Sequence, residues 1–395
     1  MTMAQFGAAR IADIAEVKGG KRLPANANLV STPTAHAYIR GRDIRDGKIT
    51  LDDPMYVLDE DFEKIRRYTV DSGDVCITIV GNIGDVGITP PHLHRASLTE
   101  NAVKLVNLRE GIDARFLMYA LLAPDAQSQM KLSAAGAAQP KLGIYKVNEI
   151  KVPLPSLSVQ RRIAGILSAY DKLIENSQRR IRISETMARA LYREWFVHFR
   201  FPWHENHPRV ASPLGEIPEG WEVRTVEEIV RRIPVGKKYD QKTVNPTGTV
   251  PVFDQGKSGI IGYHDDEPGV VASETAPVIV FANHTCYQRL VHIPFSAIQN
   301  VLPFVLAPAL PRNIYWLHWA TNGLVVFNDY KGHWPEFAAK SLVVPPAELC
   351  QRFGEFVAPL SRQTLKLERQ IQNLRRTRDL LLPRLLSGQI DVEAA

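Results

Sequence analysis

The sequence predicts an α+β protein with two similar globular mixed α/β domains, separated by two long antiparallel coiled-coil helices with pseudo-two-fold symmetry. One observation is a proline-led segment that begins at Lys151, runs into a long helical stretch, and recurs 190 residues later at Ser341. A second is a heptad pattern in both helical stretches. A third is that each stretch follows a compact, turn-rich segment. A repeat of domain and helix suits binding at two places on one ligand better than one reaction.

The repeat places equivalent residues 190 positions apart, so that Pro155 matches Pro345, and Arg162 matches Arg352. We expect domain boundaries at 1–155 for the first domain, 156–200 for the first helix, 201–220 for a linker, 221–346 for the second domain, 347–388 for the second helix and 389–395 for a tail.

Apolar residues at heptad spacing predict that the two helices pair with each other, and chain order makes such a pair antiparallel. Pro359 lies inside the second helix, where we expect the helix to kink or a new helix to begin. The alternative is two helices that pack on separate globular domains. The residues predicted to pair the helices are Ile163, Leu167, Tyr170, Ile174, Ile181, Leu191, Phe353, Val357, Leu360, Leu367, Ile371, Leu374 and Leu381.

Short apolar runs bounded by turn residues predict strands in both domains. We expect them at 75–80 and 100–108 in the first domain, and at 250–254, 276–282 and 323–327 in the second. A helix is expected to follow Asp113, which is a candidate N-cap.

Composition is ordinary for a globular protein, with 45% hydrophobic and 23% charged residues. No apolar run is long enough to span a bilayer, and we expect no membrane association. The three cysteines are far apart and form no metal-binding pattern, so a reducing cytoplasm fits best. His198, His204 and His207 lie in the linker without fixed spacing, and we expect no metal site there.

The net charge of +6 is concentrated in the helices, because residues 156–200 hold nine basic and four acidic side chains. A basic helix is usually a solvated face, so local patches are better evidence for a nucleic-acid partner. Basic residues dominate 18–48 and 231–257, near the start of each domain. One basic patch at the equivalent place in each domain is what a protein needs if both of its domains contact phosphate.

Fragments of catalytic motifs are present but incomplete. The segment 251–258 resembles a phosphate-binding loop, but its first glycine is a proline and no helix follows. The segment 53–56 resembles a methyltransferase loop without the glycine-rich cofactor loop that should precede it. The glycines at 81, 84 and 87 have the wrong spacing for a dinucleotide fingerprint. We therefore predict no catalytic residue in this chain.

Taken together, the motifs resemble the specificity subunit of a type I restriction-modification system. The resemblance rests on QRRIAGILSAYDKLIE, its repeat near the C-terminus, the ending LLLPRLLSGQIDV, and the entry segments GEIPEGWEVRTVEEI and YIRGRDIRDGKI. It covers essentially the whole chain. The second domain departs from it, since we find no counterpart of the SGDVCITIVGNIG segment of the first domain.

The resemblance implies a DNA-binding subunit that performs no chemistry. Each target-recognition domain would recognise one half of a split site on double-stranded DNA, and the helices would fix the spacer between the halves. The partners implied are two methyltransferase subunits, which bind S-adenosylmethionine and methylate adenine, and motor-nuclease restriction subunits. No cofactor is expected in this chain itself.

Residue chemistry assigns candidate DNA contacts. Lys21, Arg22, Lys237 and Lys238 should contact phosphate, while Arg40 and Arg42 could contact either phosphate or guanine. Weaker candidates for base contact are Asn82, Tyr239, Lys257, Gln299 and Asn300, with solvated or turn-stabilising roles as the alternative.

Two other functions stay open at this point, a stand-alone DNA-modifying enzyme and a coiled-coil scaffold that does not bind DNA. The DNA target and the spacer length do not follow from the sequence, and neither does whether the system cleaves DNA or only methylates it.

Overall fold

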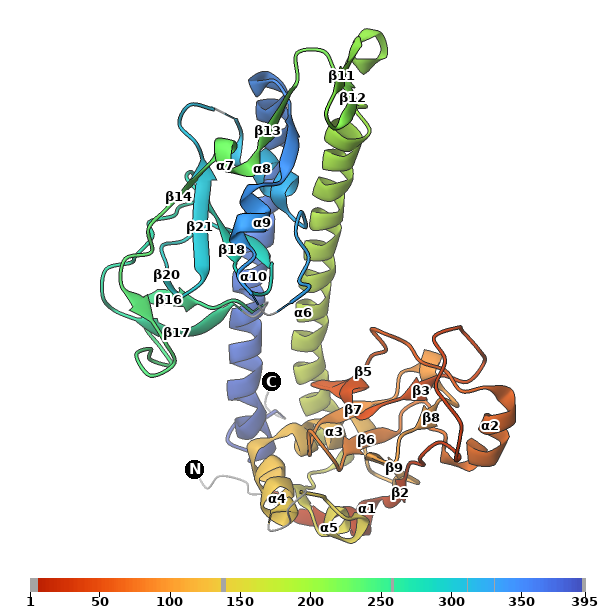
Figure 1. Cartoon of the computed structure of the whole chain (residues 1–395). Helices are drawn as coiled ribbons and strands as arrows, with labels where there is room; N and C mark the ends of the chain where they lie inside the picture. The colour runs from red at the N-terminus through yellow and green to blue at the C-terminus, as the bar shows by residue number, and fades with distance from the viewer. Residues whose placement is uncertain (1–5, 136–139, 257–258, 311, 330, 393–395) are drawn as a thin grey trace. The chain divides into compact units, whose positions relative to one another are not determined.

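A computed structural model describes residues 6–135, 140–256, 259–310, 312–329 and 331–392 of the chain. It divides into two compact units (Figure 1). Unit 1 comprises Met1–Glu175 and Gln372–Ala395, and unit 2 comprises Asn176–Ile371. Two long helices, α6 (Leu157–Tyr192) and α10 (Ala347–Leu386), each contribute one part to unit 1 and another part to unit 2.

Unit 1 is built on a six-stranded sheet in the order β2-β9-β6-β7-β5-β4. Figure 1 shows α3 beside β7 and β6, while α2 lies at the far side of the sheet. The elements are β1 (Ala8–Arg10), α1 (Ile11–Ile14), β2 (Glu16–Gly19), β3 (Tyr38–Ile39), η1 (Gly41–Asp43), β4 (Ile44–Arg45), β5 (Gly47–Ile49), α2 (Asp59–Ile65), η2 (Arg66–Tyr68), β6 (Val75–Thr78), β7 (Val86–Ile88), η3 (Pro91–Leu93), β8 (Ser97–Leu98), β9 (Ala102–Val106), α3 (Ala114–Leu122), α4 (Pro124–Ala134), α5 (Ile144–Asn148) and β10 (Lys151–Pro153).

The strands expected at 75–80 and 100–108 form as β6 and β9. Asp113 caps α3, because its carboxylate accepts hydrogen bonds from the amides of Arg115 and Phe116. The helical segment after Asp113 is two helices, since Ala123 is extended before Pro124 and proline disfavours a helical residue in front of it.

Unit 2 holds two four-stranded sheets, in the orders β14-β21-β18-β19 and β15-β20-β16-β17. A hairpin of β11 and β12 precedes them. The elements are η4, a π-helical turn (Arg193–Val197), η5 (His204–Asn206), β11 (Arg209–Ser212), β12 (Gly215–Pro218), β13 (Glu222–Thr225), α7 (Val226–Ile229), β14 (Val230–Arg232), β15 (Lys238–Tyr239), β16 (Val250–Phe253), β17 (Ile260–His264), β18 (Val278–Ala282), β19 (Gln288–Val291), β20 (Ser296–Ile298), β21 (Val301–Leu306), α8 (Ile314–Thr321), α9 (Trp334–Ala338) and β22 (Ser341–Val344).

Both units share one connectivity. The order β2-β9-β6-β7 of unit 1 corresponds to β14-β21-β18-β19 of unit 2, and all these pairs are antiparallel. The parallel pair β3–β8 corresponds to β15–β20, and β1–β10 corresponds to β13–β22. The second domain lacks the SGDVCITIVGNIG motif in its sequence, but β18 and its following loop take the structural place of β6 and its loop. The sequences diverge while the backbone pairing is retained.

The strand expected at 323–327 does not form. The segment is irregular, with Val326 and Phe327 73% and 52% exposed. An apolar run favours a strand only where a neighbouring strand offers free backbone groups and a surface to pack on. Here Gly323 turns the chain at the end of α8 with a φ of +82°.

Within each unit, parts of α6 and α10 pack against one another and run antiparallel. In unit 1, Ile163 and Leu167 share a core with Leu385 and Leu386. In unit 2, Ala188 shares a core with Phe353 and Val357. This arrangement matches the predicted fold class, while the pseudo-two-fold symmetry stays a prediction. No helix in the described part of the chain is long and apolar enough to cross a membrane.

The residues predicted to pair the helices differ in how deeply they are buried. The fully buried ones are Ile163, Leu167, Ile174, Phe353, Val357, Leu367 and Ile371. The half-buried ones are Tyr170, Ile181, Leu191, Leu360, Leu374 and Leu381.

Helix α10 is continuous through Pro359, so the expectation that a new helix begins there is wrong. Proline removes one amide donor and leaves the carbonyl four residues earlier without its helical partner. That carbonyl belongs to Glu355, which is exposed. Water can therefore replace the missing hydrogen bond, and packing of α10 on unit 2 holds the helix together.

One polar cluster interrupts the apolar packing of the helices in unit 1. The guanidinium of Arg378 on α10 donates from Nη1 to Oδ1 of Asp171 on α6 at 2.6 Å. The hydroxyl of Tyr119 on α3 donates to Oδ2 of the same carboxylate. Burial and this hydrogen bond raise the pKa of Tyr119. Asp171 thus connects both long helices to α3 of unit 1, and such polar contacts fix helix register.

We predict that Arg378→Leu alone destabilises the protein by about 2 kcal/mol, because it leaves Asp171 largely buried without its partner. The double variant Asp171→Leu/Arg378→Leu should recover most of that loss, since no uncompensated charge remains. Urea unfolding followed by circular dichroism measures both. A single variant as stable as the wild type would contradict the assigned role.

Candidate nucleic-acid interface

The predicted contacts of unit 1 lie in loops next to the ends of its strands. The amide of Lys21 donates to the carbonyl of Leu98 at 2.9 Å. The Arg22 Nε donates to Oε1 of Glu100 at 2.8 Å, in the turn after β8. Gly20 makes this close approach possible, since a Cβ there would lie 2.0 Å from the carbonyl oxygen of Thr99. The Arg22 side chain remains 81% exposed, so a phosphate can reach it.

Arg40 and Arg42 differ in their availability. Arg40 binds the buried carboxylate of Asp43, with Nε 3.0 Å from Oδ2, and this hydrogen bond raises the pKa of Arg40. Its backbone amide donates to the same oxygen at 2.8 Å. Arg40 therefore stabilises the start of η1. Arg42 is mainly exposed and pairs with Asp53 at 2.6 Å, a contact that a phosphate can replace.

Asn82 lies in the loop between β6 and β7. The hydroxyl of Thr78 donates to the carbonyl of Asn82, and the Gln127 amide donates to Gly84 at 2.7 Å, so the loop is held in place. The side chain of Asn82 is exposed but also hydrogen-bonds Asp85, whose pKa is raised, mainly by burial, despite this contact. This geometry leaves both the base-contacting and the turn-stabilising role open to Asn82.

In unit 2 the basic segment surrounds an aromatic stack. Tyr239 is buried and stacks on His264 with ring centroids 4.2 Å apart. Its hydroxyl and Lys237 both bind Oδ2 of Asp266, at 3.1 and 2.8 Å. The hydrogen bond from Lys237 holds the pKa of Asp266 below its usual range. Lys238 is exposed and forms no ion pair among the described residues.

An open hollow of 1010 Å³ brings several loops of unit 2 together. Lys238, Tyr239 and Gln299 line it. Asn300 lies next to Gln299, and its carbonyl accepts from the amide of Asn283 at 2.9 Å. Lys257 lies outside the described residues. The structure thus brings the other predicted residues of unit 2 to one region.

Sequence reasoning missed a further group in this hollow. Gln255 accepts at Oε1 from the amide of His284 at 2.8 Å, and its carbonyl accepts from the Thr285 hydroxyl at 2.6 Å. The side-chain amide of Gln255 lies 3.5 Å from Nδ1 of His284. These residues follow β16 and β18, so their place directly after two predicted strands was the signal that could have identified them.

The linker histidines have structural partners. Nδ1 of His204 lies 2.8 Å from the carbonyl of Phe201, and Nε2 of His207 lies 2.8 Å from that of Glu219. Trp203 stacks under the guanidinium of Arg352, 4.4 Å from the ring centroid. No group of three metal-ligating side chains occurs anywhere in the described ranges.

The two candidate surfaces occupy equivalent places in the shared connectivity. Arg40 and Asp240 directly follow β3 and β15, while Thr99 and Gln299 follow β8 and β20. The loops after β6 and β18 complete each set. Exposed cations at such loops suit phosphate, and amide side chains suit base edges, which together are the two components of DNA recognition.

Comparison with known proteins supports this assignment. Residues 4–185 match the family described as type I restriction modification DNA specificity domain. A type I restriction enzyme specificity subunit of Methanocaldococcus jannaschii is 24% identical over 81% of this chain and 78% of its own length. Residues 4–185 thus match the DNA specificity domain of type I systems, and the chain is similar to type I specificity subunits over most of its length. The DNA specificity domain supports DNA recognition by this chain, and the subunits that carry this domain in type I systems are non-catalytic.

A second relative is more similar, but over a shorter part of this chain. The MjaVIII specificity subunit of the same organism is 32% identical, over 34% of this chain and 30% of its own length. Among solved structures, the S subunit of a type I system from M. genitalium superimposes with a TM-score of 0.59 at 15% identity, covering 98% and 97% of the two chains. At this identity the likeness shows a shared fold.

We predict different effects for two arginines of unit 1. Arg40→Ala should destabilise unit 1 by roughly 2 kcal/mol, because the buried Asp43 carboxylate loses its charged partner. Arg22→Ala should leave the thermal midpoint unchanged but weaken DNA binding, since Arg22 is largely exposed. Calorimetry and fluorescence anisotropy with duplex DNA separate the two effects. The opposite pattern would show that the roles are reversed.

Proposed function

We propose that the chain recognises a bipartite DNA target, with the loops of unit 1 contacting one half-site and those of unit 2 the other. The observation that carries this proposal is one connectivity built twice with different side chains at its loops. Arg40 and Asp240 illustrate the difference, because they occupy equivalent positions with opposite charges. A retained framework with divergent loops suits two half-sites of different sequence.

The helices would set the spacer between the half-sites. Their pairing is specified by buried apolar residues and, in unit 1, by the Asp171–Arg378 pair. A packed helix pair resists compression, so it suits a fixed distance better than a flexible linker does.

The same helices would dock two methyltransferase subunits. Ile166 on α6 and Phe356 on α10 stand 190 residues apart, at equivalent positions, and both are exposed, by 38% and 58%. Large apolar side chains on the outside of helices are typical of interaction sites. Equivalent apolar positions favour one kind of partner bound twice. The methyltransferase would supply S-adenosylmethionine, the restriction subunits would join through it, and the complex would act in the cytoplasm.

We predict that reversing the charges of Lys21, Arg22, Lys237 and Lys238 to Glu abolishes tight DNA binding. Each lost phosphate contact should reduce the slope of log affinity against log salt by about 0.9. Anisotropy titrations across a salt series measure this slope. If the affinity for DNA and its salt slope both stay unchanged, these residues do not contact DNA and the scaffold function would be favoured.

Deleting 173–179 and 370–376 removes one heptad from both helices and keeps their seam in phase. The deletion shortens each helix by about 10 Å, which is about three base pairs of DNA. We predict a changed preferred spacer with unchanged half-site sequences. Selection from duplexes with randomised spacers, in the presence of methyltransferase, measures the preference. An unchanged spacer would refute the assigned role of the helices.

A further inference from the structure

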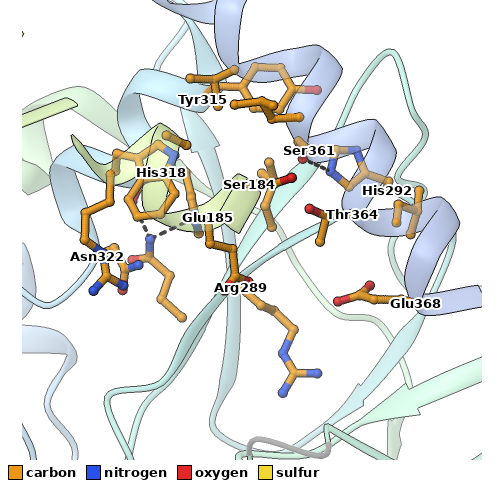
Figure 2. A pocket seen from close by; sticks show the side chains of 18 of the residues that line it. Ser184, Glu185, Arg289, His292, Tyr315, His318, Asn322, Ser361, Thr364 and Glu368 are labelled. Atoms are coloured by element: carbon orange, nitrogen blue, oxygen red, sulfur yellow. Dashed lines mark hydrogen bonds between the residues drawn. The ribbon is translucent and has the colours of Figure 1, made fainter. Parts of the chain in front are cut away.

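Unit 2 contains a second hollow, of 530 Å³, against the two long helices (Figure 2). Its walls come from α6, α10, α8 and β19. Ser184 of α6 faces Ser361 and Thr364 of α10 across it, with Glu368 further along α10 (Figure 2). The hollow contains none of the predicted DNA contacts.

The internal repeat explains why the hollow exists. The helix offset of 190 residues makes Ser361 equivalent to Asp171, and Ala188 equivalent to Arg378. The N-caps Asp113 and Asn313 align α3 with α8, which makes Trp319 equivalent to Tyr119. Ala188, Ser361 and Trp319 all line the hollow. It therefore occupies the place where unit 1 holds its Tyr119–Asp171–Arg378 cluster.

Two further helix positions have smaller side chains in unit 2. Thr364 is equivalent to Ile174, and Ser184 is equivalent to Leu374. Four side chains of the helix pair are thus smaller in unit 2 than their equivalents in unit 1. The largest difference in volume is the replacement of Arg378 by Ala188. Helix interfaces are close-packed, and unfilled volume in them costs stability. Retaining such a hollow favours an occupant.

Two carboxylates and two guanidinium groups line the hollow. Glu185 and Glu368 line it and form no ion pair among the described residues. Desolvation at the wall and the neighbouring Glu185 raise the pKa of Glu368. Arg189 lies over the Trp319 ring at 5.7 Å. Arg289 lies over Phe253 and donates to the carbonyl of Gly256 at 2.5 Å. Both arginines thus have partners of their own, and although Arg289 also acts on Glu368 electrostatically, neither carboxylate forms an ion pair among the described residues.

Two deeply buried polar side chains in the wall are incompletely bonded. His292 and Gln288 are each only 6% exposed. Nε2 of His292 lies 3.0 Å from the Ser361 hydroxyl, but its Nδ1 has no partner among the described residues. The Gln288 amide donates to the carbonyl and to Nδ1 of His318, and its Oε1 is likewise unpartnered. Because buried polar atoms in native proteins are nearly always hydrogen-bonded, these two atoms favour a polar occupant of the hollow.

We propose that this hollow binds a small organic cation that carries a guanidinium or amine group. The cation would take the place that the Arg378 side chain fills in unit 1. Glu368 and Glu185 would accept its charged hydrogen bonds, and Tyr315 and Trp319 would provide aromatic surface for a planar group. Bound there, the cation would support the packing of α6 on α10 in unit 2, as Arg378 does in unit 1.

The test uses agmatine, which has both groups, and butylurea as its neutral planar analogue. We expect saturable calorimetric binding of agmatine to the full chain and a thermal midpoint that rises with agmatine concentration. Butylurea at the same concentrations and ionic strength should give neither. Absence of saturable agmatine binding to the wild type would overturn the proposal.

Variants locate the binding. Glu368→Gln should weaken the affinity for agmatine at least tenfold. Glu355→Gln is the control, because Glu355 is exposed on the same helix outside the hollow, and this variant should bind agmatine as the wild type does. The double variant Ala188→Arg/Ser361→Asp rebuilds the ion pair of unit 1 inside the hollow. It should raise the thermal midpoint and abolish agmatine binding. Unchanged binding in both Glu368→Gln and the double variant would place the cation elsewhere and refute the site.

Discussion

The packing of α6 against α10 within each unit is the constraint on which the rest of the structure depends. Each helix buries one part of its length in unit 1 and another in unit 2, so neither core is complete without both helices. Ile163 and Leu167 share their core with Leu385 and Leu386, which follow them by more than two hundred residues. The sheets are attached to this pair through α3 and α8, whose buried faces meet the helices. A change in helix register would therefore disturb both recognition sheets.

The same constraint explains why the two halves diverge unevenly. Backbone pairing retains the connectivity from β2 to β9 and from β14 to β21, because hydrogen bonds between strands are independent of side-chain identity. The loops at the sheet edges are exposed and free to vary. Polar contacts inside the helix pair differ as well, with Arg378 in unit 1 and Ala188 in unit 2. One framework thus carries two different surfaces, which is what recognition of two different half-sites requires.

Sequence patterns predicted the long-range architecture better than the local detail. The helix pairing followed from heptad spacing, since burial of one stripe depends only on helix periodicity. The expected strand at 323–327 was wrong because an apolar run does not reveal whether a partner strand exists. The positions of Lys238 and Gln299 in one hollow reflect the parallel pairing of β15 with β20, which the sequence does not show. Arg40 has a structural role because it pairs with the buried carboxylate of Asp43. The charge of these residues does not predict which of them is buried.

The central claim is that one chain recognises two half-sites at a distance set by its helices. Mapping N6-methyladenine across the genome of a cell that carries this chain and its methyltransferase tests it most directly. The account predicts one bipartite motif, with two different half-sites and a spacer of constant length and no sequence preference. A continuous motif, or methylation that does not change when this chain is removed, would contradict it.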